Sequence, residues 1–304
     1  MILLAEHRVP AQTPPTRLSD YAREVFAEWF SRKGIKKAIK QGAVLLDDRR
    51  GYTGDWVLPG QTLRLLDLAW KKPKALALSL PIIYEDEELA VIHKPAGIPV
   101  SGNQYRTIQN TLLYNLKAST AKNALPWPQA AHRLDALTSG LLLIGKTRPT
   151  LQHLGRLFEE KQVHKTYTAV VVGAFSPAEG TWTTEIDGKA ARTDFKCLSC
   201  QPSLRFDWLS TLHLFPQTGR THQIRRHLAQ ATYPILGDQL YGRDGKILKG
   251  KGLFLAATGL QFSHPTRSEM MNFEISPPAK FASFVARKAR RAKRFGEAST
   301  TNPS

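Results

Sequence analysis

Residues 132–143 of the chain read His132-Arg133-Leu134-Asp135-Ala136-Leu137-Thr138-Ser139-Gly140-Leu141-Leu142-Leu143. The leucines that end this stretch predict a buried strand, and the polar and small residues before them predict a loop that leads into it. Catalytic groups commonly lie on loops that a rigid sheet holds in place. In isolation the same residues would also fit a capped turn, in which Asp135 and Thr138 accept hydrogen bonds from backbone N–H groups. The rest of the chain decides between these two interpretations.

Short apolar runs separated by turns dominate the chain from residue 82 onward. They predict strands at Ile82–Tyr84, Leu89–His93, Leu141–Ile144, Tyr167–Val172, Phe195–Leu198, Leu209–Phe215 and Phe273–Ile275. Helical spacing is rarer and predicts helices at Leu112–Lys117, Pro149–Lys161 and His222–Gln230. Strands outnumber helices and do not alternate regularly with them. The pattern therefore favours an α+β domain with a mixed, mostly antiparallel central sheet and flanking helices.

A smaller unit with helical spacing precedes this domain. Apolar residues between Leu18 and Phe30 recur at i, i+3, i+4 and i+7, which predicts an amphipathic helix. Ser31 can cap a second helix that ends at Gly42. Two short strands follow, at Val44–Leu46 and Val57–Leu66. We expect these elements to form a small α/β unit over residues 17–68.

The second of these helices would carry one almost wholly basic face. Its basic residues are Arg32, Lys33, Lys36, Lys37 and Lys40. The whole chain has a formal net charge of +18, and such a surplus of Lys and Arg is typical of proteins that bind the phosphates of nucleic acids. An anionic membrane surface, or solubility alone, would also explain the charge.

The remaining segments complete the expected domain organisation. Residues 1–16 contain three prolines and predict an irregular leader. Residues 69–80 predict a basic linker, and residues 81–285 predict the larger domain. Residues 286–304 predict a basic tail, a helix end followed by disorder, because six Lys and Arg residues crowd positions 287–294 and polar residues follow.

The composition indicates a globular protein of the cytoplasm. No apolar run approaches the roughly 18 residues of a membrane helix, and the amino terminus meets Glu6 too early for a signal peptide. The chain has only two cysteines, Cys197 and Cys200, which fits a reducing cytosol. Their C-x-x-C spacing has no second pair, so ordinary core cysteines are favoured over a zinc or redox site.

A second group of motifs lies further along the chain. Residues 218–228 read Thr218-Gly219-Arg220-Thr221-His222-Gln223-Ile224-Arg225-Arg226-His227-Leu228. A glycine-containing turn that leads into a helix offers backbone N–H groups and guanidinium groups to a phosphate or a carboxylate, although a plain basic helix face would give the same pattern. Three more motifs accompany it, namely Lys94-Pro95-Ala96-Gly97, Lys165-Thr166-Tyr167 and Pro234-Ile235-Leu236-Gly237-Asp238-Gln239-Leu240-Tyr241-Gly242.

The five motifs, in the order in which they occur along the chain, resemble those of the RNA pseudouridine synthases that share the signature H-R-L-D-x-x-T-S-G-L. These enzymes form the RluA/RsuA-like bacterial class, and the resemblance is closest to the RluA family. The resemblance spans roughly residues 82–278. Residues 17–66 also resemble the RNA-binding module first known from ribosomal protein S-four. The residues that carry this second resemblance are Arg17-Leu18, Ser31-Arg32, Ile39, Gly42, Val44 and Pro59-Gly60.

The sequence departs from these patterns at two places. The S-four-like module usually has a Val-Asn-Gly turn where this chain has Leu46-Asp47-Asp48, so the RNA-contact surface of the module is expected to differ. The synthases often have His before the final Ala where this chain has Leu255-Ala256-Ala257. Neither departure touches the residues that the resemblance implies in catalysis.

The resemblance implies that Asp135 is the catalytic carboxylate. It would act on a uridine whose base detaches, rotates and rejoins the ribose through carbon 5, without a cofactor or a metal. Direct attack on the ribose and a glycal-type elimination both remain open. Arg225 would pair with Asp135 and favour its ionised form. Tyr167 would stack on the target base and could assist proton removal from carbon 5.

Further substrate-binding positions follow from the same resemblance. Arg133 would fill the gap left by the flipped base, or bind a nearby phosphate. Ile224 would be an apolar wall of the pocket. The remaining substrate-binding candidates are His132, Thr138, Arg220 and His222. The expected partner is RNA, with large-subunit ribosomal RNA favoured over transfer RNA, and the expected state is a monomer.

Three other functions compete with this hypothesis. An RNA methyltransferase would need a glycine-rich loop for its methyl donor, and no G-x-G-x-x-G is present. A glycosidase would need a second carboxylate near Asp135, where the motif has Arg instead. A non-catalytic RNA-binding or ribosome-assembly protein on the same fold is the main alternative, and the intact Asp135, Tyr167 and Arg225 argue against it.

Overall fold

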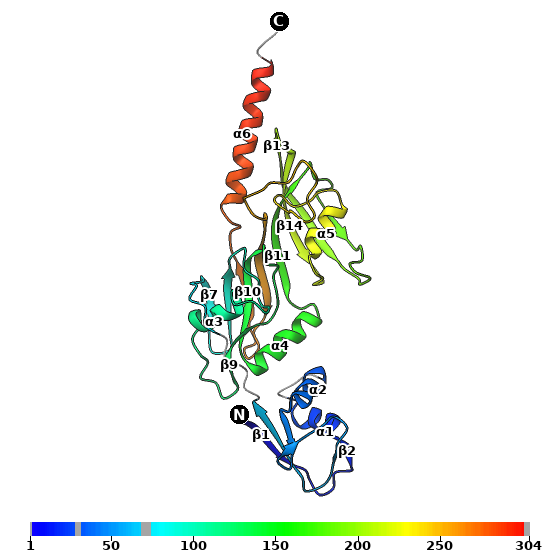
Figure 1. Cartoon of the computed structure of the whole chain (residues 1–304). Helices are drawn as coiled ribbons and strands as arrows, with labels where there is room; N and C mark the ends of the chain where they lie inside the picture. The colour runs from blue at the N-terminus through cyan, green and yellow to red at the C-terminus, as the bar shows by residue number, and fades with distance from the viewer. Residues whose placement is uncertain (1, 28–31, 68–73, 301–304) are drawn as a thin grey trace. The chain divides into compact units, whose positions relative to one another are not determined.

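The computed structural model of the 304-residue chain describes residues 2–27, 32–67 and 74–300 (Figure 1). Two compact units, Met1–Pro73 and Lys74–Ser304, divide the chain, and each has a hydrophobic core of its own. Among the described residues, no helix is both long enough and apolar enough to cross a membrane. The predicted cap at Ser31 lies outside the described residues, as do positions 28–30 of the predicted first helix and positions 69–73 of the predicted linker.

The first unit packs two helices against antiparallel strands. Its elements are β1 (Ile2–Arg8), β2 (Thr16–Arg17), α1 (Leu18–Val25), α2 (Arg32–Gln41), β3 (Val44–Leu46), β4 (Arg49–Arg50), β5 (Trp56–Val57) and β6 (Thr62–Asp67). The sheet order is β1-β6-β3-β4, and β2 pairs separately with β5. Leu18, Ile39 and Leu63 are among its fully buried core residues, so the amphipathic spacing of the helices serves the core as expected.

The first eight residues correct one prediction. An irregular leader was predicted for residues 1–16, but Ile2–Arg8 forms strand β1, which pairs antiparallel with β6 from Ile2 opposite Asp67 to Arg8 opposite Thr62. The backbone of β1 finds its hydrogen-bonding partners in a strand that follows it by more than fifty residues. Such a distant partner leaves no periodic signal in the leader itself.

The second unit is built on a ten-stranded sheet of order β12-β13-β14-β11-β15-β10-β8-β7, with β16 paired to β15 and β9 paired to β10. The strands are β7 (Ile82–Glu85), β8 (Leu89–Lys94), β9 (Ala124–Ala130), β10 (Ser139–Thr147), β11 (His164–Val172), β12 (Glu179–Trp182), β13 (Thr193–Ser203), β14 (Asp207–Pro216), β15 (Leu255–Ser263) and β16 (Met270–Glu274). Only β10 and β15 pair in parallel in this sheet, within the described residues. The predicted α+β fold with a mixed, mostly antiparallel sheet is confirmed.

Four helices accompany the sheet in the described part of this unit. They are α3 (Ile108–Asn115), α4 (Arg148–Glu159), α5 (Gln223–Gln230) and α6 (Lys280–Thr300). The prediction of a helix at Leu112–Lys117 began and ended too late, because the Thr107 hydroxyl accepts the Asn110 N–H and caps α3 earlier. The predicted disorder of the tail is also wrong up to Thr300, since α6 continues to that residue from a run rich in Ala, Lys and Arg, which are good helix formers.

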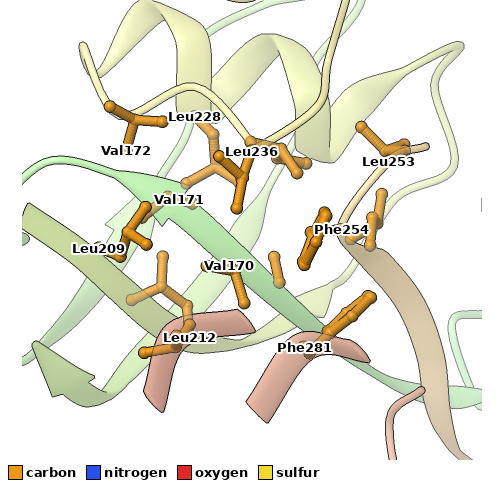
Figure 2. Packing of buried hydrophobic residues seen from close by; sticks show 14 of the residues in the cluster. Val170, Val171, Val172, Leu209, Leu212, Leu228, Leu236, Leu253, Phe254 and Phe281 are labelled. Atoms are coloured by element: carbon orange, nitrogen blue, oxygen red, sulfur yellow. The ribbon is translucent and has the colours of Figure 1, made fainter. Parts of the chain in front are cut away.

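The largest core of the second unit surrounds strand β11. Ala169–Val172 are buried, as expected for a continuous apolar run that is covered on both faces. In Figure 2, Leu228 of α5 and Phe281 of α6 lie on opposite sides of the β11 ribbon. The two helices therefore cover opposite faces of the same part of the sheet.

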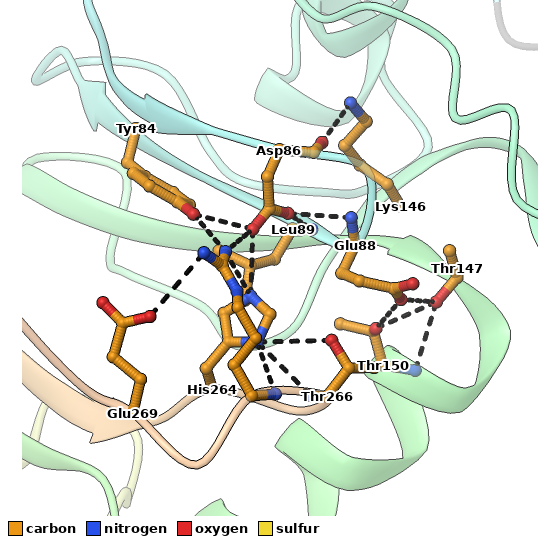
Figure 3. A network of polar contacts seen from close by, with 11 residues as sticks. Tyr84, Asp86, Glu88, Leu89, Lys146, Thr147, Thr150, His264, Thr266 and Glu269 are labelled. Carbon is orange, nitrogen blue, oxygen red and sulfur yellow. Dashed lines mark hydrogen bonds and ion pairs between the residues drawn. The ribbon is translucent and has the colours of Figure 1, made fainter.

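A polar network ties two turns of the second unit together at another part of the sheet. The Asp86 carboxylate accepts hydrogen bonds from the Tyr84 hydroxyl at 2.7 Å, the His264 ring at 2.9 Å and the Arg267 guanidinium (Figure 3). It also accepts the N–H groups of Glu88 and Leu89. These bonds hold the pKa of Asp86 at about 2 in spite of its partial burial. The network joins the β7–β8 turn to the β15–β16 turn.

A buried lysine holds the loop at residues 131–138, between β9 and β10, in place by hydrogen bonds. Lys94, the last residue of β8, donates from Nζ to the carbonyl oxygens of Pro95 at 2.9 Å, Ala136 at 3.1 Å and Thr138 at 2.7 Å. Burial lowers the pKa of Lys94 to about 8, although the negative charge of Asp135 opposes that change. Two of the three carbonyl groups belong to residues directly around Asp135, so Lys94 sets the course of the loop.

Strand β10 begins with a close backbone approach that only glycine allows. Gly140 has φ +120° and lies opposite Ala257 of β15 in the parallel pair. A Cβ atom at this position would lie 2.0 Å from the Ala257 carbonyl oxygen. Gly155, in the middle of α4, is the opposite case, because a Cβ atom there meets nothing within 4 Å.

These two glycines give a matched test of the fold. Gly140→Ala should lower the free energy of unfolding by about 3 kcal/mol or more, because the methyl group combines a strained φ with an overlap on the neighbouring strand. Gly155→Ala should raise it by about 0.5–1 kcal/mol, because alanine favours the helix. Urea unfolding of both variants measures the difference. Equal effects would show that the β10–β15 approach is not as close as described.

Lys94 predicts a pH dependence of stability. Between its folded pKa of about 8 and its ordinary value of 10.5, the unfolded chain binds more protons than the folded chain, so the contribution of Lys94 to the free energy of unfolding rises with pH. The rise should amount to about 3 kcal/mol at most. In Lys94→Met this rise is absent. The difference between wild type and variant in urea unfolding should therefore grow from about pH 8 to pH 10; a constant difference would contradict the burial of the charged ammonium.

Candidate active site

A cavity of about 350 Å³ lies where the 131–138 loop, the first half of β11 and the turn before α5 come together. It is lined by all nine residues predicted as catalytic or substrate-binding in this unit, namely His132, Arg133, Asp135, Thr138, Tyr167, Arg220, His222, Ile224 and Arg225. The sequence therefore predicted a set of positions that the fold brings together from three separate segments. β15 separates β10 from β11 in the sheet, and its residue Leu255 also lines the cavity.

The Asp135 carboxylate faces two cationic or potentially cationic side chains. Its Oδ2 atom lies 3.8 Å from Nη1 of Arg225, and its Oδ1 atom lies 3.9 Å from Nε2 of His222. Both distances exceed that of a hydrogen bond, so these contacts orient the carboxylate by charge without occupying its lone pairs. About a fifth of the Asp135 side chain is exposed (21%), which keeps it accessible from the cavity.

Arg225 is held in place by a second carboxylate, Asp238. Its Nε and Nη2 atoms donate to the two oxygens of Asp238 at 2.7 and 2.9 Å, a bidentate pair in which both side chains are buried. The Asp238 Oδ1 atom also accepts the N–H groups of Leu240 and Tyr241, each at 3.0 Å. This leaves Nη1 of Arg225 as the guanidinium atom that approaches Asp135.

Mutual stabilisation keeps this buried pair charged. Burial alone would lower the pKa of Arg225, but its hydrogen bonds to Asp238 and the charges of Asp238 and Asp135 raise that pKa above its ordinary value. Burial likewise works against the charge of Asp238, yet the bonds from Arg225 and from backbone N–H groups lower the pKa of that carboxyl. The cavity therefore has a permanent positive charge beside Asp135.

Asp238 was missed as a site residue by sequence reasoning. It stands in the motif that runs from Pro234 to Gly242, to which no role was assigned. Tyr241 of the same motif lies under the guanidinium, with the Arg225 Cζ atom 5.0 Å from its ring, and its hydroxyl is 3.1 Å from Nδ1 of His222. The signal available in the sequence was an acidic and an aromatic residue after a glycine turn, too common a pattern to imply a function.

Tyr167 and Lys165 reach the cavity from the same strand, β11. Burial, helped by the negative charge of Asp135, raises the pKa of Tyr167 well above its ordinary value, so its hydroxyl stays protonated. Burial lowers the pKa of Lys165. Lys165 was quoted in a motif but given no role, and it adds a further basic group to the cavity wall.

His132 and Thr138 lie near the two ends of the 131–138 loop. The His132 Nε2 atom accepts the Leu143 N–H at 3.1 Å, and burial lowers the pKa of His132 to about 3, so its ring is neutral and is fixed to strand β10. The Thr138 hydroxyl is buried and has no hydrogen-bonding partner within the described part of the chain. An unpaired buried hydroxyl costs about 1–3 kcal/mol, which a ligand in the cavity could relieve.

The turn before α5 is shaped by local hydrogen bonds. Gln223 accepts from both the Thr218 hydroxyl, at 2.6 Å, and the Arg220 N–H, at 3.0 Å. His222 adopts a left-handed conformation with φ +54° and immediately precedes the helix. Ile224 is buried in the cavity wall, whereas Arg133 and Arg220 are exposed at its edge. The cavity therefore has an apolar wall at Ile224 and a positively charged opening at Arg133 and Arg220.

The other predicted positions do not line this cavity. In the first unit, Lys36, Lys37 and Lys40 are exposed on α2, while the side chains of Arg32 and Lys33 lie outside the described residues. Cys197 and Cys200 are free thiols on β13. Among the residues that the structure describes, no group of three or more His, Cys, Asp or Glu side chains is arranged to hold a metal ion.

Comparison with known proteins shows which family the chain resembles. Residues 88–230 match the family model described as RNA pseudouridylate synthase. An uncharacterized RNA pseudouridine synthase of Aquifex aeolicus is 32% identical over 294 residues, which cover 88% of this chain and 92% of the relative. The ribosomal large subunit pseudouridine synthase D of Xylella fastidiosa is 34% identical over 291 residues, which cover 86% of this chain and 85% of the relative.

A solved structure gives the same result. The human RNA pseudouridylate synthase domain containing 1 aligns with a TM-score of 0.54 and 27% identity, over 66% of this chain and 84% of the human chain. The predictions of the family and of the enzyme class are therefore confirmed. The chain belongs to the RNA pseudouridine synthase family.

Proposed function

We propose that this protein converts a specific uridine of a structured RNA into pseudouridine, with Asp135 as the catalytic carboxylate acting on a flipped-out nucleotide. The observation that carries the proposal is the position of Asp135, whose carboxylate lines the cavity 3.8 Å from an Arg225 that Asp238 keeps charged and fixed. A preorganised charge next to a reacting carboxylate is a common source of catalytic power.

Asp135 acts as a carboxylate on either chemical route. In one route the carboxylate attacks ribose carbon 1′ as the bond to base atom N1 breaks, and base carbon 5 later displaces the carboxylate from carbon 1′. In the other route the carboxylate removes a proton from ribose carbon 2′ as the bond to N1 breaks, which gives a glycal, and the proton returns to carbon 2′ when carbon 5 bonds to carbon 1′. In both, the uracil rotates before carbon 5 bonds, and the proton lost from carbon 5 is balanced by one taken up at N1. Arg225 lies beside the carboxylate and orients it towards the sugar in either case.

The cavity supplies the contacts that a flipped uracil needs. Its volume lies within the range of about 300–1,000 Å³ typical of small-ligand sites. Tyr167 stacks on the base and Ile224 closes the apolar wall, while the unpaired Thr138 hydroxyl bonds to a polar edge of the ring. Because the pKa of Tyr167 is raised, stacking suits it better than proton abstraction.

The mouth of the cavity suits the rest of the nucleotide. Arg133 and Arg220 are exposed there, so their guanidinium groups can bind phosphates or occupy the space left by the flipped base. His132 contributes by fixing the loop rather than by a charge, since its ring is neutral and bonded to the backbone.

Large-subunit ribosomal RNA is the proposed substrate, in preference to transfer RNA. Support comes from relatives of this chain that are named as ribosomal large subunit pseudouridine synthase D, in Xylella fastidiosa and Xanthomonas campestris among others. We assign the chain to the RluA family, as a cytoplasmic monomer that needs no cofactor. The proposed divisions are an S-four-like RNA-binding module at residues 17–68, with exposed lysines on α2, and a catalytic domain at residues 81–285.

Asp135→Asn tests the proposal directly. Wild type incubated with unmodified total RNA should yield pseudouridine that carbodiimide mapping detects, and the variant should lose at least about a thousandfold in rate because an amide can neither attack nor carry the charge. RNA binding by the variant should persist, which separates catalysis from affinity. Binding by wild type without product would favour the RNA-binding or ribosome-assembly alternative.

Asp238→Asn tests how Arg225 is positioned. The amide keeps the size of Asp238 but removes the charge that fixes the guanidinium, so kcat should fall by about tenfold to a hundredfold with KM nearly unchanged. Breaking a buried pair should also lower the free energy of unfolding by about 3 kcal/mol.

The same helix provides the control. Arg226 pairs with the exposed Asp187 at 2.8 Å, outside the cavity, so Asp187→Asn should change the free energy of unfolding by less than about 1 kcal/mol and leave kcat unaltered. Similar kcat values for Asp238→Asn and Asp187→Asn would remove Asp238 from the catalytic arrangement.

A further inference from the structure

Helix α6 has two chemically distinct faces. Phe281, Phe284 and Val285 are buried in the core around β11, and Ala289 and Ala292 continue the same stripe in partly buried positions. This spacing keeps one side of the helix against the sheet over about three turns. The opposite side of α6 faces away from the sheet, and the whole helix belongs to the second unit.

The outer side of α6 concentrates positive charge. Six basic residues stand within eight positions, namely Arg287, Lys288, Arg290, Arg291, Lys293 and Arg294. The sequence has no acidic residue between Lys280 and Phe295. The α6 arginines at 287, 290 and 291 are exposed, and none of them forms an ion pair with an acidic side chain among those the structure describes.

These cations repel one another. Burial lowers the pKa of Lys288, and the charges of Arg287, Arg291 and Arg205 lower it further. Like charges three or four residues apart on a helix are destabilising, so α6 keeps this arrangement at a cost that its packing against the sheet offsets. A polyanion bound along the outer side would relieve the repulsion.

The charge spacing fits a nucleic acid duplex. Eight helical residues span about 12 Å, so α6 presents about one positive charge per 2 Å of its length. Double-stranded nucleic acid carries about one negative charge per 1.7 Å of axis. An anionic membrane fits less well, because an interfacial helix inserts an apolar face and the apolar face of α6 is already buried against the sheet.

We infer that the outer side of α6, defined by Arg287, Arg290, Arg291 and Arg294, is a second RNA-binding surface that holds a duplex arm by its phosphates. The identity of the RNA rests on the proposed function. A groove of about 640 Å³ runs between α6 and strands β13 and β14, and Arg290 lines it together with Ser199 and Gln201. Most of its lining is apolar, and α6 contributes Phe281, Val285 and Ala289 to it, so Arg290 stands at the boundary between the groove and the charged outer side.

This surface is distinct from the cavity. The cavity includes the first residues of α5, and α5 and α6 cover opposite faces of the sheet around β11 (Figure 2). One flipped nucleotide therefore cannot touch both. α6 engages RNA remote from the target uridine, so it favours long substrates over short stem-loops.

The test compares two quadruple variants of the full chain. R287Q/R290Q/R291Q/R294Q removes four charges, whereas R287K/R290K/R291K/R294K keeps them, and Arg, Lys and Gln have similar helix propensities. Circular dichroism checks that both retain the wild-type helix content. Fluorescence anisotropy then measures binding to a labelled hairpin RNA with a long duplex arm over a series of KCl concentrations.

The Gln variant should bind the hairpin at least about tenfold more weakly. The slope of its plot of log affinity against log salt concentration should be smaller in magnitude by about two to four. The Lys variant should keep the wild-type slope. Pseudouridine formation by the Gln variant should fall about tenfold in kcat/KM on the long RNA and stay at the wild-type level on a short stem-loop. An unchanged salt slope in the Gln variant overturns the inference.

A second arm uses vesicles of phosphatidylcholine and phosphatidylserine. Loss of vesicle binding by the Gln variant, with RNA binding intact, would make the outer side of α6 a membrane surface and overturn the inference. The salt dependence of RNA binding is measured without catalytic turnover. The experiment can therefore refute the RNA-binding surface and the proposed function independently of each other. A charge-dependent slope in a protein that forms no pseudouridine supports the surface and refutes the proposed activity.

Discussion

The buried ion pair between Arg225 and Asp238 is the interaction on which the cavity depends. Two buried charges are stable only because each satisfies the other and Asp238 also accepts two backbone N–H groups. That requirement fixes the start of α5 against the segment after Gly237, and it leaves one guanidinium nitrogen facing Asp135. The charge beside the proposed catalytic carboxylate is thus built into the packing of the fold rather than supplied by a mobile surface side chain.

Buried polar groups also fix the opposite wall of the cavity. Lys94 binds the carbonyl groups around Asp135, and His132 accepts a backbone N–H of β10. Neither side chain has to touch a substrate to matter, because a loop held on both sides loses little freedom when a ligand binds. The 131–138 loop is thereby held as part of the sheet.

The sequence predicted those parts that have local or compositional signals. Apolar runs marked β8, β10, β11 and β14, and short motifs identified Asp135, Tyr167 and Arg225. Strand β15 was not predicted, because Leu255-Ala256-Ala257-Thr258-Gly259 has neither alternation nor many β-branched residues; its small side chains serve close backbone contacts such as that with Gly140. Asp238 and Lys94 were quoted without a role, since their importance comes from burial and from partners distant in sequence.

Strand β15 also has a consequence for the order in which the molecule assembles. β7, β8, β9 and β10 form one set of neighbouring antiparallel strands, and β11 to β14 form another, each from a continuous stretch of chain. β15 lies between the two sets and is made after both. During synthesis the two halves can therefore fold early, and the sheet that carries the cavity is complete only when residues 255–263 join them.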